Sequence, residues 1–275
     1  MRNDGRQPDE LRPLRFKRRY TRQAPGSVLV SMGRTTVLCT CCVELAVPPF
    51  LTGKGKGWLT AEYGMLPGST QTRKPRDRGG KIDGRSVEIQ RLIGRALRAV
   101  VNLETLGERT LWIDCDVLEA DGGTRTAAIN GAYVALIDAL NAERKNVPTQ
   151  SVGTRGPQSL GARGHVPMQS LGTRDLLVPL PPVSAIVRGS VAAVSVGLLE
   201  GRTLLDLDYS EDKDADVDLN LIMTGAGDVI EVQAGGEEAT FSRKQLDHLL
   251  DLGKRGIDAI TLTQRAALRS NWPLD

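Results

Sequence analysis

Residues 111–140 read LWIDCDVLEADGGTRTAAINGAYVALIDAL, and this stretch decides the fold. Its first part, from Leu111 to Val117, alternates and is rich in β-forming residues, so it predicts a strand. Its last part predicts a helix, because apolar side chains recur there at helical spacing: Ile129, Tyr133, Leu136, Ile137 and Leu140. The strand leads directly into the helix through a polar turn at residues 121–126.

The joining turn has the composition of an anion-binding loop. Gly122 and Gly123 let the backbone turn tightly and approach a ligand, and the hydroxyl of Thr124 or Thr126 can cap the helix. The amides of the first helical turn point toward any anion placed there, and Arg125 adds a planar set of donors that matches phosphate oxygens. On this pattern alone, a plain helix cap is the first interpretation and a phosphate site is the second.

The composition is that of an ordinary globular protein. The 275 residues are 40% hydrophobic and 25% charged, which is enough to build the core of one or two domains. No apolar run approaches the length of a membrane span, and the polar start from Met1 to Asp4 lacks the apolar core of a signal peptide. We therefore expect a cytoplasmic protein.

Three of the four cysteines lie close together in an apolar segment that predicts a strand. Cys39, Cys41 and Cys42 are therefore expected to be buried thiols of a reducing compartment. Cys39 and Cys42 form a CxxC pair, but no second pair of cysteine or histidine residues follows at the spacing of metal ligands. We do not expect a zinc site.

The two ends of the chain differ in charge. Residues 1–100 contain 20 Lys and Arg against 8 Asp and Glu, whereas residues 101–275 contain 16 against 25. A solvated surface with separated signs explains this pattern. An enzyme that processes a polyanion, with a basic part beside an acidic part able to bind a metal ion, explains it as well.

The N-terminal part predicts three strands joined by glycine-containing turns, at residues 14–20, 26–32 and 35–43. Residues 53–57, GKGKG, look like a phosphate-binding loop, but they lack the Gly-Lys-Ser/Thr ending of a P-loop. They predict a flexible surface loop. The short turns between the three strands predict that the start of the chain is antiparallel.

Residues 64–84 lack periodicity and predict a mobile basic loop, with Arg73, Lys74, Arg76, Arg78 and Lys81. A helix with one apolar stripe then begins at Gly84. Arg85 lies at the start of this helix, where the helix dipole disfavours a cation unless an anion is bound beside it. Arg85 is therefore a second candidate phosphate contact.

The helical pattern ends after Leu140, and an insert is expected at about 142–182. It contains three imperfect copies of one short unit, at residues 150–155, 158–163 and 169–174. A unit this short and rich in Gly, Ser and Pro cannot build a solenoid, so it predicts an expanded, poorly ordered loop.

The C-terminal part repeats the plan of strands followed by a helix. Residues 190–199 and 202–208 predict one hairpin, and residues 217–224 and 229–233 predict another. Ser242 predicts the cap of a final helix. The two similar halves indicate an α+β fold.

An acidic group follows the first of these hairpins. Strand alternation is expected to place Asp206 and Asp208 on the face opposite Leu205 and Leu207, with Asp212 just past the end of the strand. Such a group is usually a solvated strand end. Carboxylates that converge at one edge also suit magnesium or manganese.

Six blocks of the chain resemble the bacterial ribonuclease PH family of phosphorolytic exoribonucleases. They keep the order of the family and read GWLTAEYGMLP (57–67), GRSVEIQRLIGRALRAVV (84–101), IDCDVLEADGGTRTAAINGAYVAL (113–136), VAAVSVG (191–197), LLDLDYSEDKDADVDLNLIMTG (204–225) and FSR (241–243). The resemblance implies one domain over residues 1–275, built from two βα halves with pseudo-twofold symmetry. It also implies a homo-hexamer, as a trimer of dimers, that removes 3′ nucleotides from tRNA precursors with inorganic phosphate and releases nucleoside diphosphates.

The resemblance implies roles for residues that match the motifs of the family. It gives phosphate binding to Arg85, Gly123, Thr124 and Arg125, and it gives catalysis and the metal ion, magnesium or manganese, to Asp206 and Asp212. The two phosphate contacts proposed from the residues alone lie within this set. No side-chain nucleophile is required, in agreement with the lack of a Ser-His or Cys-His arrangement in the sequence.

The basic loop matches the family only in part. Of the arginines that bind tRNA, the resemblance retains Arg73 and Arg76, whereas Gly68 replaces an arginine of the family. Arg78 is absent from the family pattern but lies in the same loop, so we expect it to bind RNA as well. Residues 234–236 also depart from the pattern.

Two other functions compete with this interpretation. A non-catalytic ring subunit that only binds RNA would keep the fold, but it is expected to lose the phosphate-binding arginines or the acidic pair, and all are present here. A small-molecule kinase or nucleotide enzyme would need a complete ATP-binding glycine loop, which residues 53–57 do not supply.

Overall fold

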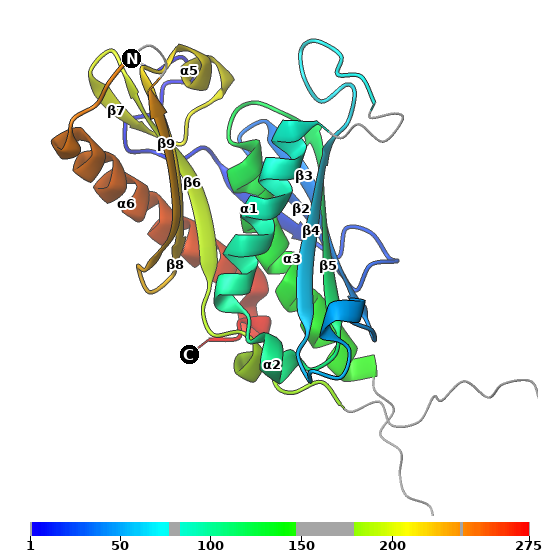
Figure 1. Ribbon diagram of the computed structural model, residues 1–275. Coiled ribbons are helices and arrows are strands. Elements are labelled where there is room, and N and C mark those ends of the chain that lie inside the picture. The colour runs from blue at the N-terminus through cyan, green and yellow to red at the C-terminus, as the bar shows by residue number, and fades with distance from the viewer. Residues whose placement is uncertain (1, 77–82, 147–178, 237–238, 275) are drawn as a thin grey trace, which may run out of the picture.

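Two β-sheets and the long helices between and beside them form the computed structural model (Figure 1), which describes residues 2–76, 83–146, 179–236 and 239–274. This is the α+β architecture that the sequence predicted. None of the described helices combines the length and the apolar character that crossing a membrane requires.

The first sheet has the strand order β1-β2-β3-β5-β4. Its strands are β1 (Leu14–Arg18), β2 (Gly26–Met32), β3 (Thr35–Glu44), β4 (Trp58–Met65) and β5 (Thr110–Glu119). The first three and β5 confirm the predicted strands. Strand β4 was missed, because its partner β5 lies about fifty residues further along the chain and pairs with it in parallel, from Trp58 opposite Thr110 onward. Local patterns do not reveal such a long crossover connection.

The second sheet has the order β7-β6-β8-β9, and all its pairs are antiparallel. Its strands are β6 (Val191–Leu199), β7 (Arg202–Leu205), β8 (Val217–Thr224) and β9 (Val229–Gly236). Both predicted hairpins are confirmed. Strand β7 ends three residues earlier than expected, which changes the position of the acidic residues that follow.

Helix α3 (Thr124–Asn146) lies between the two sheets and contacts β2, β3 and β6 (Figure 1). Nearly every residue from Ala127 to Leu140 is buried, so the helix has no solvated face. The buried side chain of Asn130 joins α3 to the second sheet, because its amide donates to the carbonyl of Ala193 and accepts from the Ala193 amide, both at 2.8 Å. One continuous core therefore spans both halves.

Helices α1 (Gly84–Val100) and α6 (Arg243–Leu268) flank this core. The predicted Ser242 cap is confirmed, since the Ser242 side chain accepts from the Gln245 amide in a capping box. The remaining helices are short: η1 (Pro49–Leu51), α2 (Leu103–Leu106), α4 (Val183–Ile186), α5 (Tyr209–Asp214) and η2 (Arg269–Asn271).

The expected start of the insert, at about residue 142, is corrected by the structure. Helix α3 continues to Asn146, because Ala142, Glu143, Arg144 and Lys145 favour a helix even after the apolar pattern stops. The rest of the predicted insert lies mostly outside the described residues, and so do its three repeat units.

The predicted burial of the thiols is confirmed for Cys39 and Cys41, whereas Cys42 is half-buried. Cys39 lies opposite the buried Cys115 on strand β5.

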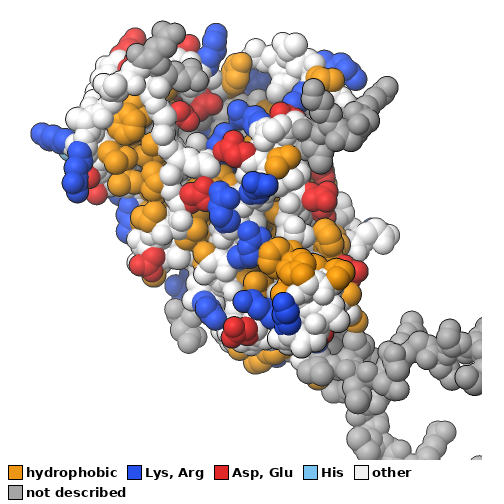
Figure 2. All heavy atoms as spheres, in the orientation of Figure 1, with side chains coloured by type: hydrophobic (Ala, Val, Ile, Leu, Met, Phe, Trp, Pro, Cys, Tyr) orange, Lys and Arg blue, Asp and Glu red, His pale blue; other side chains and the backbone are white. Residues whose placement is uncertain are grey.

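Ion pairs join the basic part of the chain to its acidic part. Arg18 of the basic part pairs with Asp138 on α3, and Arg95 on α1 pairs with Glu231 on β9 at 2.7 Å. Figure 2 shows Lys and Arg side chains over α1 with acidic side chains among them. The sequence segregation of charge therefore does not produce a surface of one sign on this face.

The close approach of α3 to the first sheet gives a test of the packing. A Cβ atom at Gly131 would lie 2.7 Å from both the sulfur of Cys39 and a methyl group of Val30. We expect Gly131→Val to lower the free energy of unfolding by about 1–3 kcal/mol through overpacking. Gly84→Val is the matched helical control, because a Cβ at Gly84 meets nothing within 4 Å. Urea unfolding measures both variants, and equal midpoints would contradict this packing.

Candidate functional site

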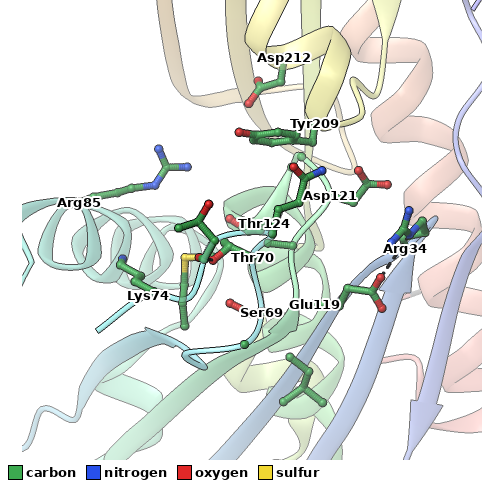
Figure 3. A pocket seen from close by; sticks show the side chains of 18 residues that line it. Arg34, Ser69, Thr70, Lys74, Arg85, Glu119, Asp121, Thr124, Tyr209 and Asp212 are labelled. Atoms are coloured by element: carbon green, nitrogen blue, oxygen red, sulfur yellow. Dashed lines mark hydrogen bonds and ion pairs between the residues drawn. The ribbon is translucent and has the colours of Figure 1, made fainter. Parts of the chain in front are cut away.

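A cleft of about 660 Å³ lies where the two halves meet (Figure 3). It is lined by the chain after β4, the start of α1, the turn between β5 and α3, and helix α5. Its size is in the range of small-molecule and nucleotide sites.

The turn between β5 and α3 lies at the centre of the cleft wall. Gly122 and Gly123 adopt positive φ angles of 73° and 63°, which only glycine adopts readily. A Cβ at Gly122 would lie 2.7 Å from the carbonyl oxygen of Leu207, so the turn packs directly on the second half. The hydroxyl of Thr35 fixes the turn by donating to the Gly122 carbonyl at 2.6 Å and accepting from the Asp121 amide at 2.8 Å.

The two threonine hydroxyls proposed as helix caps have other partners. Thr124 accepts from the hydroxyl of Tyr63 at 2.8 Å, and the Thr126 hydroxyl donates to the Gly123 carbonyl at 2.8 Å. The plain-cap interpretation therefore does not explain these residues. The turn is held by Thr35 and by the packing of Gly122.

Two cations lie across the cleft from this turn. Arg85 follows the N-cap residue Asp83, whose carboxylate accepts from the Arg85 amide at 3.3 Å and pairs with Lys74 at 2.7 Å. The hydrogen bond from Lys74 lowers the pKa of the Asp83 carboxyl. Asp83 explains how a cation is tolerated at this helix start. Lys74 was seen in the sequence only as one residue of a basic loop, and its place in the cleft was missed.

Arg125 does not line the cleft with Arg85. Its guanidinium donates to the side-chain oxygen of Gln233 on β9 at 2.8 Å and lies 3.4 Å from the carboxylate of Glu88 on α1. The predicted phosphate residues are thus brought together only in part. Arg85, Gly123 and Thr124 share the cleft, and Arg125 is held beside it.

The solvated strand end, one of the two interpretations of the acidic group, does not hold for Asp206. Strand β7 ends at Leu205, and Asp206 adopts a left-handed backbone with φ of 56°, so the alternation stops before it. The Asp206 side chain is fully buried, and both its oxygens accept from Arg12, at 2.8 Å from the backbone amide and at 3.0 and 2.6 Å from the guanidinium. Burial lowers the pKa of the Arg12 guanidinium, but the charge and hydrogen bonds of Asp206 outweigh burial and raise it.

Arg12 belongs to a buried group of charges that the sequence did not reveal. Arg2 binds the carboxylate of Glu211 through two bonds of 2.7 and 2.6 Å. Arg6 lies 3.8 Å from the carboxylate of Asp206 and 3.6 Å from that of Glu211. The N-terminal segment therefore docks on the second half through three arginines.

The other two acidic residues lie on helix α5. Asp208 caps this helix in a capping box with Glu211, and Asp212, one turn later, lines the cleft. Asp212 is exposed at the cleft surface, but the surrounding cleft wall still shields its carboxyl from part of the solvent and so raises its pKa, and the charge of Asp218 adds to this effect against nearby arginines.

The donors suit a divalent cation that also takes oxygens from a ligand. Asp212 offers one carboxylate in the cleft, whereas Arg12 occupies the oxygens of Asp206. The described residues contain no group of three or more acidic, His or Cys side chains placed to hold an ion by themselves. Magnesium is commonly held by one or two carboxylates together with phosphate oxygens, and this arrangement fits that mode.

Comparison with known proteins decides the family. The model of the "3' exoribonuclease family, domain 1" matches residues 10–140, and that of domain 2 matches residues 189–256. The chain belongs to the 3′ exoribonuclease family. Ribonuclease PH of Rhodopirellula baltica is 50% identical over 266 residues, which cover 97% of each chain.

Solved structures share the fold of the 3′ exoribonuclease family. A crystal structure of rice Rrp46 matches with a TM-score of 0.70 at 18% identity, covering 98% of this chain and 100% of that one. The exosome of Archaeoglobus fulgidus with RNA bound to the active site matches with a TM-score of 0.71 at 23% identity, covering 95% and 91%. At these identities the structures support the fold alone.

The basic loop of this family member borders the cleft. Gly68 lines it, and Arg73 and Arg76 are exposed beyond it. Arg78 lies outside the described residues.

The two carboxylates proposed for the metal ion are expected to respond differently to substitution. Asp206→Asn should lower the free energy of unfolding by about 3–5 kcal/mol, because it leaves the buried Arg12 uncompensated. Asp212→Asn should leave stability unchanged or slightly raised. The raised pKa means that folding disfavours the Asp212 carboxylate at neutral pH, and the amide removes that cost.

Chemical denaturation at pH 7 tests this difference. Asp214→Asn, on the exposed end of α5, is the control. If Asp206→Asn is as stable as the unmodified protein, the ion pair does not hold the two halves together.

Proposed function

We propose that this protein is a phosphate-dependent 3′-5′ exoribonuclease that trims the 3′ ends of tRNA precursors and releases nucleoside 5′-diphosphates. The observation that carries the proposal is the cleft that Arg85 and Lys74 line together with the Gly123–Thr124 turn and Asp212. The full-length similarity to a protein named Ribonuclease PH supports it.

Inorganic phosphate is proposed to bind between Arg85, Lys74 and the start of α3. Charged donors and helix amides are suited to its oxygens, and the open backbone at Gly123 allows close approach. Arg125 reaches this anion if it exchanges its long contact with the exposed Glu88 for a phosphate oxygen.

The reaction needs positioning more than a reactive side chain. A phosphate oxygen bonds to the phosphorus of the last phosphodiester while the bond to the preceding 3′ oxygen breaks, and that oxygen takes up the proton that the attacking hydrogen phosphate loses, directly or through water. The residues of the cleft hold the two reactants in line and stabilise the charge of the transition state. Because a phosphoanhydride bond replaces a phosphodiester bond and the chemistry is nearly balanced, excess nucleoside diphosphate is expected to drive extension of the 3′ end.

Asp212 is proposed to hold magnesium or manganese together with phosphate oxygens. When bound, the ion supplies positive charge beside the reacting phosphates. Asp206 contributes a ligand only if its carboxylate gives up a hydrogen bond to Arg12. Its more direct contribution is to fix Arg12 against the carbonyl of Asp121 in the phosphate turn.

The assembly and location follow from the resemblance. We propose a homo-hexameric ring of three dimers in the cytoplasm, with the basic loop contacting tRNA.

The central experiment incubates the protein with magnesium and an RNA that carries a 3′ extension, with and without phosphate. We expect release of nucleoside diphosphates only with phosphate. Monophosphates released without phosphate would contradict the proposal, and RNA binding without release would favour the non-catalytic ring subunit.

Substitution of Arg85 tests the phosphate site. Arg85→Ala should raise the KM for phosphate about 10- to 150-fold, because it removes a charge-assisted contact of roughly 1.5–3 kcal/mol. Arg125→Ala should have a smaller effect, since Gln233 and Glu88 already hold its guanidinium. Arg91→Ala is the control on the same helix, because Arg91 is exposed and does not line the cleft. An equal KM for Arg85→Ala and Arg91→Ala would place phosphate elsewhere.

Restoring the arginine at position 68 tests RNA binding by the loop. Gly68 lines the cleft and a Cβ there meets nothing within 4 Å, so Gly68→Arg fits without strain. It should tighten precursor binding and steepen the log–log dependence on salt by about 0.7–0.9 for one added phosphate contact. Gly68→Gln controls for size, and an unchanged slope for the arginine variant would show that position 68 does not reach RNA.

A further inference from the structure

Tyr209 is the aromatic side chain among the residues that line the cleft, and it has no assigned role. It is the first residue of α5 and is 48% exposed. Its backbone is fixed, because Asp208 caps the helix immediately before it and a Cβ at Gly122 would lie 2.9 Å from its amide nitrogen. An exposed ring on a fixed backbone therefore stands directly beside the phosphate turn.

The ring also marks the passage between two cavities. A second cavity of about 420 Å³, which reaches Asn3 and Ser210, adjoins the main cleft. The two cavities share Arg34, Gln71, Asp121 and Tyr209. Figure 3 shows the Tyr209 ring between Asp212 and the turn that carries Thr124. A chain that ends at the phosphate site and leaves through the second cavity passes this ring.

We propose that Tyr209 is the stacking surface for a nucleobase of one of the two nucleotides that flank the scissile phosphodiester. The inference rests on the proposed function. Every base has a π face, so stacking holds the 3′ end without selecting its sequence, as the trimming of varied 3′ ends requires. The exposed Arg34, paired with Glu119 at 3.2 Å, offers a cation to the backbone of the same strand.

Binding in phosphate-free buffer tests this surface separately from catalysis. Tyr209→Leu should weaken the Kd of a short single-stranded RNA about 5- to 100-fold, whereas Tyr209→Phe should leave it within about twofold, since the ring and not the hydroxyl stacks. The same measurement is made with two abasic RNAs, one without the base of the terminal nucleotide and one without the base of the penultimate nucleotide. The loss of affinity caused by Tyr209→Leu should disappear on the RNA that lacks the stacked base.

Turnover and a second tyrosine provide the controls. With saturating RNA, Tyr209→Leu should leave the KM for phosphate unchanged. Tyr20→Leu, at a tyrosine of similar exposure outside both cavities, should change neither Kd nor KM.

A penalty of Tyr209→Leu that is equal on intact and both abasic RNAs, or no penalty at all, would overturn the inference. So would a loss of affinity in Tyr209→Phe equal to that in Tyr209→Leu. Failure of the proposed function is seen separately, as absence of phosphate-dependent nucleotide release by the unmodified protein.

Discussion

The buried pair of Arg12 and Asp206 is the contact on which the cleft depends. Arg12 belongs to the segment before β1 and Asp206 follows β7, so the pair joins the two halves of the chain. The same guanidinium donates to the carbonyl of Asp121 in the phosphate turn. One arginine thus fixes the second half against the wall where the anion is proposed to bind.

Such a pair is a costly way to connect two halves. Removing charges from water opposes folding, and an apolar contact of the same size is often as stable. What the charges add is direction, because the three bonds from Arg12 allow Asp206 only one orientation. The left-handed backbone of Asp206 fits this interpretation, since such strain persists where the surroundings determine the conformation.

Local patterns predicted the elements whose partners are near in sequence. The β2–β3 pair, both hairpins of the second sheet, the cap of α6 and the strand-turn-helix at residues 111–140 all follow from spacing and turn residues. Strand β4 and the arginine cluster did not, because their partners lie about 50 and 200 residues away. Asp206 was misplaced for a related reason. Alternation is reliable only while the strand continues, and a single residue with positive φ ended it.

The same limits apply to the site. Composition marked the glycine turn and Arg85, since a helix start with free amides attracts anions whatever the rest of the chain does. It gave no sign that Lys74 would face them, or that Arg125 would be held by Gln233 on a strand from the other half. Those positions depend on how the halves meet.

The N-terminal segment orients helix α5, and through this helix it orients two side chains of the cleft. Tyr209 and Asp212 are three residues apart and share one face of this short helix, whereas Glu211 points to the opposite face and is buried. Arg2 binds both oxygens of Glu211, and Glu211 also accepts from the Asp208 amide in the capping box. The rotation of α5 about its axis is therefore set from its buried side. A helix of six residues has too few hydrogen bonds to hold its own orientation. The direction of the Tyr209 and Asp212 side chains toward the cleft therefore depends on Arg2, near the start of the chain.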